Sequence, residues 1–304
     1  MPDLPPVGTR VSLRYRLPAG SVPPLTDVVG HLVEVGQVLR VRTKRDDVVD
    51  VAAADVVAIR GLTEAPVRTG DIRNLEHAAA LAWPGIERQW IDGWLLRYGH
   101  GSTRRANSAV PLEVRGDLSA LPAIIDWYAA RDVPPLLAVP DRLFRVPPGV
   151  PTDGENVVMT TDVATDSPAP ASTVTSAVRM ADRPDAQWLR AYVRDVPPDV
   201  LTAVVDGEVV FAARSDRAVG RAAVTSAPDG TRWAGLSAVH VVEEHRREGH
   251  ARTLCEVLLR WAAGRGATRA YVQVLADNAP AIALYESMGF GTQHRVRYVD
   301  ARTL

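Results

Sequence analysis

The sequence predicts an α/β protein of the α+β kind, in which a small N-terminal β-barrel precedes a larger part with a mixed central sheet. Short Val-rich runs without a helical period fill residues 1–62, which indicates antiparallel strands. Strands and one-sided helices alternate in residues 177–304. Residues 161–176 are poor in large apolar side chains and are predicted to be a linker. Residues 63–160 lie between the barrel and this linker and are called the intermediate part below.

Composition excludes several classes of partner. The 304 residues carry a net charge of −1, which suggests neither nucleic acid nor membrane as a partner. No apolar run approaches the roughly 20 residues of a membrane span, and the first residues do not read as an export signal. The single Cys255 cannot form an internal disulfide, as is usual in a reducing compartment. We therefore expect a cytoplasmic protein.

The N-terminal part reads as a five-stranded barrel. Its opening Gly8-Thr9-Arg10-Val11, followed by a long loop, is similar to SH3-like barrels. Arginines at alternate strand positions could form a basic face, or they could simply be the solvated face of the strands. Asp46, Asp47 and Asp50 stand close by and stacking aromatics are few, which argues against nucleic-acid binding and leaves a protein partner as an alternative for the barrel. The predicted strands are Thr9–Arg16, Thr26–Val35, Val38–Arg42, Val48–Val51 and Val56–Ile59.

The remaining elements follow from periodicity and from Gly and Pro breaks. In the intermediate part we predict helices over Asn74–Leu81 and Leu118–Ala130 and strands over Trp90–Tyr98, Arg104–Val110 and Leu136–Val139. In the C-terminal part we predict helices over Pro184–Asp195, Gly249–Arg265 and Ala279–Met288, and strands over Val209–Arg214, Val219–Thr225, Trp233–Val242, Ala270–Leu275 and Val296–Val299.

One junction between a strand and a helix has the composition of a phosphate-binding turn. It reads Arg246-Arg247-Glu248-Gly249-His250-Ala251. Small residues at 249 and 251 let a ligand approach the backbone closely, and the first helical turn offers unpaired N–H groups. The two arginines add positive charge. Taken alone the pattern is weak, because a tight turn with surface arginines would look the same.

A second junction supplies companion residues. Asn278 follows a predicted strand and suits a helix cap, with Pro280 in the tolerated first turn. Tyr285 lies seven residues after Asn278, so the two share a helix face with the small Ala281 between them. A slender ligand could lie along that face.

With these two motifs in this order, residues 175–304 resemble the GNAT superfamily of N-acetyltransferases. The resemblance implies acetyl-CoA as donor and co-substrate, with its pyrophosphate on the backbone of residues 247–251. The family's turn pattern falls on Arg246, Gly249 and Ala251. The pantetheine arm would pair with the strand around His240, Val241 and Val242 and contact Asn278, and Tyr285 would stand at the thioester sulfur. The cofactor site would thus comprise Val241, Val242, Arg246, Arg247, Glu248, Gly249, His250, Ala251, Asn278 and Tyr285.

The resemblance extends more loosely upstream. Trp83-Pro84 through Asn107 is similar to the N-terminal part of two-part actinobacterial GNAT proteins, some of which carry an SH3-like barrel in front. Residues 75–160 lack the phosphate turn. The predicted parts are therefore residues 1–62 as the barrel, 63–160 as an incomplete GNAT-like half without its own cofactor site, 161–176 as the linker and 177–304 as the GNAT domain.

The reaction expected from this resemblance is direct attack of an amine on the thioester within a ternary complex, without a metal. Tyr285 would protonate the leaving thiolate, and His240 is the first candidate for the base that deprotonates the amine, although it could merely pack on its strand. Glu208 and Glu243 are weaker candidates. The N–H of Val241 or Val242 could stabilise the oxyanion. Cys255 lies on an apolar helix face, so packing explains it better than a covalent route.

Two alternatives stay open at this level. The chain could be a non-catalytic module that binds acetyl-CoA or a partner on the same scaffold. The acceptor could be a small amine, a protein lysine or an N-terminus, because the fold does not choose among them. Residues that could line the acceptor pocket are Trp90, Trp94, Tyr98, Arg104, Arg105 and Asn107.

Overall fold

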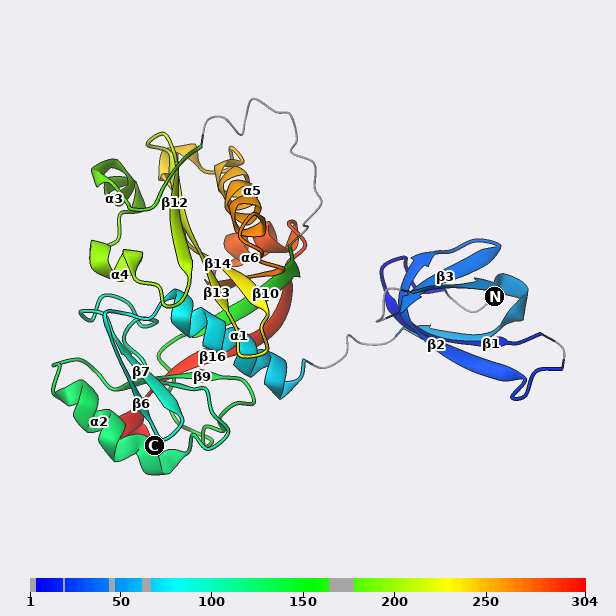
Figure 1. Cartoon of the computed structure of the whole chain (residues 1–304), viewed down its shortest axis with the longest axis horizontal. Coiled ribbons are helices and arrows are strands. Elements are labelled where there is room, and N and C mark those ends of the chain that lie inside the picture. The colour runs from blue at the N-terminus through cyan, green and yellow to red at the C-terminus, as the bar shows by residue number, and fades with distance from the viewer. Residues whose placement is uncertain (1–3, 19, 44–46, 62–66, 164–177) are drawn as a thin grey trace. The chain divides into compact units, whose positions relative to one another are not determined.

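The computed structural model describes residues 4–18, 20–43, 47–61, 67–163 and 178–304 (Figure 1). The chain divides into two compact units, Met1–Pro66 and Val67–Leu304. Most of the predicted linker lies outside the described residues. None of the described helices is long and apolar enough to span a membrane.

The first unit is a five-stranded antiparallel sheet in the order β4-β3-β2-β1-β5. Alternate side chains such as Val11, Leu13, Leu32 and Val41 fill its core, and this period-two burial explains why the strands could be predicted. The strands are β1 (Arg10–Arg16), β2 (Leu25–Glu34), β3 (Val38–Thr43), β4 (Val48–Ala52) and β5 (Val56–Gly61).

Two arginines of this unit form ion pairs with carboxylates on neighbouring parts of the sheet. Arg14 meets Asp27 through two contacts of 2.8 and 2.9 Å. Arg40 lies 2.8 Å from Glu34 and 3.1 Å from Asp50. Because carboxylates neutralise Arg14 and Arg40, these two positions fit a solvated strand face better than a nucleic-acid surface.

The second unit is built on an eight-stranded sheet in the order β11-β12-β13-β14-β15-β10-β16-β9. Among the paired strands of this sheet that the structure describes, only β14 and β15 run parallel to each other, and helix α5 connects them. The strands are β9 (Leu136–Pro140), β10 (Glu155–Asp162), β11 (Arg179–Ala181), β12 (Glu208–Arg214), β13 (Ala218–Ser226), β14 (Arg232–Val241), β15 (Arg269–Leu275) and β16 (Gly291–Asp300).

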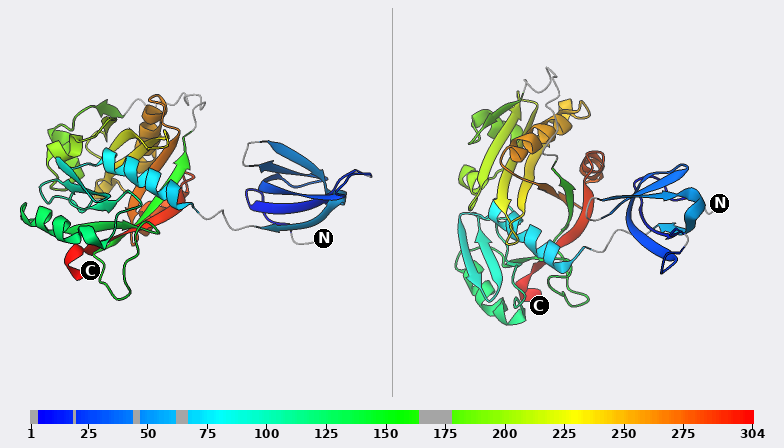
Figure 2. Two further views of the ribbon diagram at one scale, coloured as in Figure 1. Left: turned by 60° about the horizontal axis from the view of Figure 1, so that its bottom comes forward. Right: turned by 45° about the vertical axis from the view of Figure 1, so that its right-hand side comes forward.

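Helices cover both faces of this sheet (Figures 1 and 2). On one face, α5 buries Leu254 and Leu258 against residues such as Met159 and Val272. On the other, α1 buries Leu75 and neighbouring alanines against β10, β15 and β16. Truncating a buried leucine of this kind costs about 2–5 kcal/mol of folding free energy. The helices are α1 (Thr69–Ala82), α2 (Leu121–Ala129), α3 (Ala186–Tyr192), α4 (Pro198–Thr202), α5 (His250–Ala263) and α6 (Ala279–Glu286).

Strands from both predicted parts of the second unit share this one sheet. β10, from the end of the range 63–160, lies between β15 and β16 and is antiparallel to both. β9 adds the edge next to β16. The division of this unit into residues 63–160 and 177–304 remains a prediction. In the structure, strands from both ranges belong to one sheet.

A small sheet of β6 (Glu87–Ile91), β7 (Trp94–Tyr98) and β8 (Val110–Pro111) packs with α2 against the main body. The prediction of one strand over Trp90–Tyr98 is wrong, because Asp92 and Gly93 form a tight turn with φ of 43° and 86°. The strand predicted from Arg104 is also wrong. Instead, Asn107 accepts hydrogen bonds from the N–H groups of Gly99 and Gly101 and holds a loop there.

The first helix of the predicted C-terminal part is shorter than expected. It spans Ala186–Tyr192 and ends where Val193 adopts a left-handed φ of 57°. A short helix, α4, follows and was not predicted. The strand predicted over Val296–Val299 is longer than expected, because β16 begins at Gly291, and the other predicted elements of this part appear with small shifts of their ends.

Candidate functional site

The two parallel strands separate near their carboxyl ends. β14 and β15 pair from Trp233 with Arg269 to Leu236 with Val272, and beyond these residues they no longer pair with each other, although each stays paired with its other neighbour. A shift of register on β13 accompanies a positive φ of 51° at Ala238, which marks a bulge in β14. The sheet therefore opens at residues 237–241 and exposes backbone groups to a ligand.

A cavity of about 520 Å³ occupies this opening. His240 from β14 and Asn278, Ala281 and Tyr285 from α6 line one part of it, which we call the donor end. Trp83, Arg105, Tyr192 and Tyr298 are among the residues that line another part, which we call the acceptor end. One cavity thus joins the motif residues of the C-terminal sequence to residues that come much earlier in the chain.

The turn before α5 presents unpaired backbone donors. Among the described residues, no backbone acceptor takes the N–H groups of Arg247, Glu248 or Gly249. Gly249 has a φ of 80°, and a Cβ built on it would meet nothing within 4 Å. The helix follows at His250 without a side-chain cap. Free N–H groups, an open approach and a helix N-terminus together suit an anion such as pyrophosphate.

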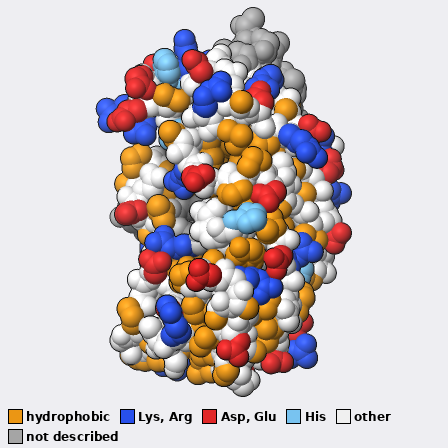
Figure 3. All heavy atoms as spheres, turned by 90° about the vertical axis from the view of Figure 1, so that its left-hand side faces the viewer, with side chains coloured by type: hydrophobic (Ala, Val, Ile, Leu, Met, Phe, Trp, Pro, Cys, Tyr) orange, Lys and Arg blue, Asp and Glu red, His pale blue; other side chains and the backbone are white. Residues whose placement is uncertain are grey.

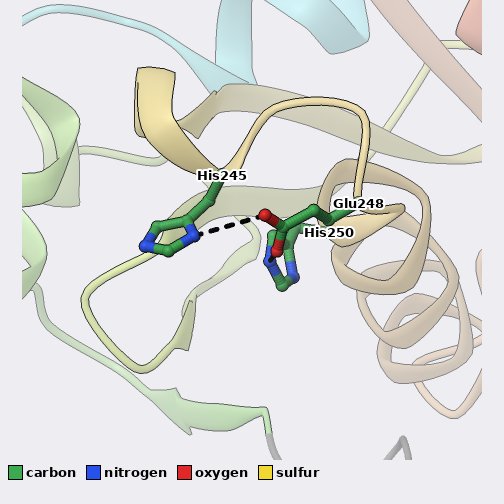
Figure 4. A group of neighbouring side chains, drawn as sticks. All are labelled: His245, Glu248 and His250. Atoms are coloured by element: carbon green, nitrogen blue, oxygen red, sulfur yellow. Dashed lines mark hydrogen bonds and ion pairs between the residues drawn. The ribbon is translucent and has the colours of Figure 1, made fainter.

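Three side chains of this turn contact one another (Figure 4). His250 Nε2 lies 3.0 Å from a carboxylate oxygen of Glu248, and His245 Nδ1 lies 3.5 Å from the other. The hydrogen bond to His250 is the main reason that the pKa of Glu248 is lowered. The three ligand atoms lie within 4.8 Å of one another, a spacing at which a metal ion could bind. The absence of a metal from the reaction remains a prediction. The contacts of Glu248 with His245 and His250 also stabilise the conformation of the turn.

His240 lies near the end of β14 and reaches the cavity. Burial, followed by the charges of Arg246 and Arg194, lowers its pKa below the usual 6.5. The imidazole is therefore neutral near pH 7, which a base requires. Of the weaker candidates, Glu208 pairs with Arg265 at 2.8 Å and Glu243 lies 3.8 Å from Arg246, and neither lines the cavity.

Tyr285 is buried and contacts Cys255. Burial raises the pKa of its phenol well above 10, and the neighbouring thiol raises it further. Burial also raises the pKa of Cys255 to about 12. Both groups therefore stay protonated near pH 7, so the phenol of Tyr285 keeps its proton and Cys255 is not a thiolate.

Of the two backbone donors expected near the thioester, Val242 is already engaged. Its N–H donates to the carbonyl of Arg217 at 2.8 Å. Because successive N–H groups of a strand point to opposite edges, the N–H of Val241 points away from β13 and toward the opening.

The side chain of Asn278 caps α6, as its position in the sequence predicted. Its oxygen accepts from the N–H of Ala281 at 3.2 Å. Its amide N–H groups make no hydrogen bond with the described residues, so they can donate to a ligand.

Only two of the six residues predicted for the acceptor pocket lie there. Arg104 and Arg105 line the cavity. Trp94 is wholly buried, Asn107 holds its loop, Tyr98 lies outside the cavity and Trp90 is exposed beside His77. Tyr192 and Tyr298 line the cavity but were not predicted to do so. For Tyr298 the sequence did offer a signal, because the residue lies in the predicted strand Val296–Val299, shortly after the second motif.

Comparisons with known proteins agree with this fold. Residues 69–299 match the family model described as "Probable histone acetyltransferase Rv0428c C-terminal", and residues 5–60 match "Rv0428c N-terminal Sm-like domain". A probable histone acetyltransferase, Rv0428c of Mycobacterium tuberculosis, is 50% identical over all of this chain and 98% of its own length.

More distant relatives point the same way. An uncharacterized N-acetyltransferase, YobR of Bacillus subtilis, is 25% identical over 75% of this chain and 98% of its own length. A GCN5-related N-acetyltransferase from Kribbella flavida covers 76% of this chain and 96% of its own, with a TM-score of 0.52 and 16% identity, which shows the fold alone.

The fold and the matches define an acetyltransferase scaffold with a small β-barrel in front. The chain belongs to the GNAT family of N-acetyltransferases, in the group of the Rv0428c-like proteins. Its N-terminal unit is an Sm-like domain by this match. That it is SH3-like in particular stays a prediction.

Proposed function

We propose that the protein transfers an acetyl group from acetyl-CoA to a primary amine within a ternary complex. The observation that carries this proposal is the continuity of one cavity. It runs from the opening between β14 and β15, where His240, Asn278 and Tyr285 line it, to a region lined by earlier residues. A donor bound at the turn could thus meet an acceptor inside the same cavity.

In this proposal each residue has a distinct task. The N–H groups of residues 247–251 and the charges of Arg246 and Arg247 bind the pyrophosphate, and the open edge of β14 pairs with the pantetheine. Asn278 donates to the pantetheine from its free amide. The N–H of Val241 stabilises the oxyanion.

Proton transfer falls to His240 and Tyr285. A primary amine such as lysine has a pKa of about 10.4, so it arrives protonated and must lose a proton before it can attack. His240, neutral near pH 7, takes that proton directly or through water. The nitrogen then attacks the carbonyl carbon, the C–S bond breaks, and Tyr285 protonates the sulfur. Cys255, with its high pKa, is a poor nucleophile, which favours direct attack over an acetyl-cysteine intermediate.

The test is release of the CoA thiol when the protein is mixed with acetyl-CoA and a panel of amines. We expect release that depends on both the protein and the amine. Calorimetric titration with acetyl-CoA in parallel shows whether the donor binds at all. Binding without transfer to any amine would contradict the catalytic proposal.

A second candidate function is a non-catalytic module that binds acetyl-CoA. The contact between Tyr285 and Cys255 favours it, because the phenol already has a partner inside the protein. The barrel could then present the bound unit to a partner protein. Under either function we expect a cytoplasmic location.

A further inference from the structure

The acceptor end of the cavity contains an arginine without an acceptor. Arg105 lines the cavity, and none of its guanidinium nitrogens makes an ion pair or hydrogen bond with the described residues. Its Nε is fully buried and unpartnered. Leaving a buried donor of a charged group unsatisfied is costly, so this group calls for a partner that the protein itself does not supply, such as water or a ligand. The neighbouring Arg104, by contrast, is paired with Asp153 through contacts of 2.9 and 2.8 Å.

The indole ring of Trp83 lies beside Arg105 and beside a second arginine. Its guanidinium carbon lies 5.6 Å from the centre of the Trp83 ring, and that of Arg221 lies 4.5 Å from the same ring. Two guanidinium groups thus share one indole. Such stacking fixes the orientation of a guanidinium and leaves its N–H edge free to bind an anion.

Arg221 adds positive charge that nothing nearby neutralises. It is wholly buried, and its donors reach the carbonyls of Ala82, Leu201 and Ala203 and the hydroxyl of Ser237. None of these acceptors is a carboxylate. Burial lowers its pKa to about 9, so the group is still charged at neutral pH.

The acidic groups of the cavity do not offset this charge. Glu155 pairs with Arg295 and Arg297. Asp195 is exposed and sits next to Arg194, which likewise has no ion pair with the described residues. The charges of these two neighbours roughly cancel, so that among the described residues that line the cavity Arg105 is left as a cation without an anionic partner.

Two hydroxyl groups complete the polar surface. Tyr192 and Tyr298 line the cavity, and no hydrogen bond from the described residues reaches their hydroxyls. Each can donate to an anion held by Arg105. Elsewhere, on the face shown in Figure 3, acidic and basic side chains are interspersed. No broad acidic surface attracts a basic peptide there.

We propose that the acceptor is an amine that also carries an anionic group, a carboxylate or a phosphate, and that Arg105 binds this group beside Trp83 with help from Tyr192 and Tyr298. The inference rests on the proposed acetyltransferase function and names the class of its acceptor. It predicts discrimination against amines whose remaining charge is positive, such as the lysines of a basic peptide.

The test compares four small amines of similar length that differ in charge, together with one basic peptide. They are γ-aminobutyrate, aminopropyl phosphate, butylamine, putrescine and a lysine-rich peptide. We expect kcat/KM for at least one of the two anionic acceptors to exceed that for butylamine by about 10- to 100-fold, the range expected when one charged hydrogen-bonded contact is lost. The better of the two identifies the anion as carboxylate or phosphate.

Variants assign the preference to Arg105. Arg105→Gln is expected to reduce the ratio of anionic to neutral acceptor to about one while acetyl-CoA affinity by calorimetry is unchanged, and Arg105→Lys to retain part of it. Arg115→Gln, an exposed arginine outside the cavity, is the matched control and should keep the full ratio. Calorimetry also shows that each variant is folded.

The possible failures can be told apart. If the wild type prefers putrescine or the peptide, or if Arg105→Gln leaves the ratio intact, the inference is overturned while the acetyltransferase stands. If no amine is acetylated although acetyl-CoA binds, the proposed function itself fails and the inference falls with it.

Discussion

The two ends of the cavity are built in different ways. The residues of the donor end come from one continuous stretch of chain, in which β14, α5, β15 and α6 follow in order, and β14, β15 and α6 supply lining residues of the cavity. The acceptor end draws on residues near positions 83, 105, 192 and 298, which only the folded sheet brings together. A donor common to a whole family can be bound by one local motif, whereas an acceptor that varies among members is bound by residues from separate segments. The following predictions test this contrast.

The largest effect is expected at the phosphate turn. Gly249→Glu places a bulky anion where the pyrophosphate would bind, and Gly249 also needs its φ of 80°. We expect acetyl-CoA affinity to fall by at least about 100-fold, since charge repulsion replaces the backbone contacts. Calorimetry measures the affinity, and Gly230→Glu, at an exposed turn with a φ of 85°, controls for backbone strain. Unchanged affinity would remove the turn from the donor site.

Removing the phenol hydroxyl of Tyr285 should lower the turnover number. Tyr285→Phe keeps the buried ring but removes the proton donor, so we expect kcat to fall by about 10- to 100-fold with little change in acetyl-CoA affinity. Steady-state thiol release together with calorimetry separates the two quantities. Wild-type turnover in this variant would exclude Tyr285 as the acid.

If His240 is the base, its protonation should lower kcat/KM at acid pH. Only neutral His240 can accept a proton, and its pKa is lowered by burial, so the neutral form predominates above a pKa that lies below 6.5. We expect kcat/KM to fall on the acid side only below pH 6.5, and this limb to disappear in His240→Gln. An acid limb that persists in the variant would assign the base to another group.

The smallest effect is expected at Cys255. Cys255→Ala removes a buried thiol that contacts Tyr285, and without that thiol the pKa of Tyr285 should be less elevated. We expect activity to change by less than about threefold, because packing and not chemistry explains the residue. A loss of activity as large as that in Tyr285→Phe, in a variant that still binds acetyl-CoA, would instead indicate a covalent route.

The contrast also explains what could be predicted from the sequence. The helix starts at Gly249 and Asn278 depend on local backbone chemistry, and the structure has both within one residue of the expected place. The five strands of the barrel follow from alternating burial. In each case, residues close in sequence determine the feature.

Features that depend on distant contacts were missed. Trp94 was expected in the pocket, but it packs against Phe144 in a core that only the fold assembles. β10 joins the main sheet between two strands that come more than a hundred residues later, and nothing in its own sequence indicates this partner. The turn at Asp92-Gly93 is different, because the dipeptide is a known hairpin signal and could have been recognised.

The central claim is that donor and acceptor occupy one cavity together. Initial rates measured while acetyl-CoA and the amine are varied independently test it most directly. Direct attack in a ternary complex predicts double-reciprocal lines that intersect. Parallel lines would show that CoA leaves before the amine reacts, and would contradict the account.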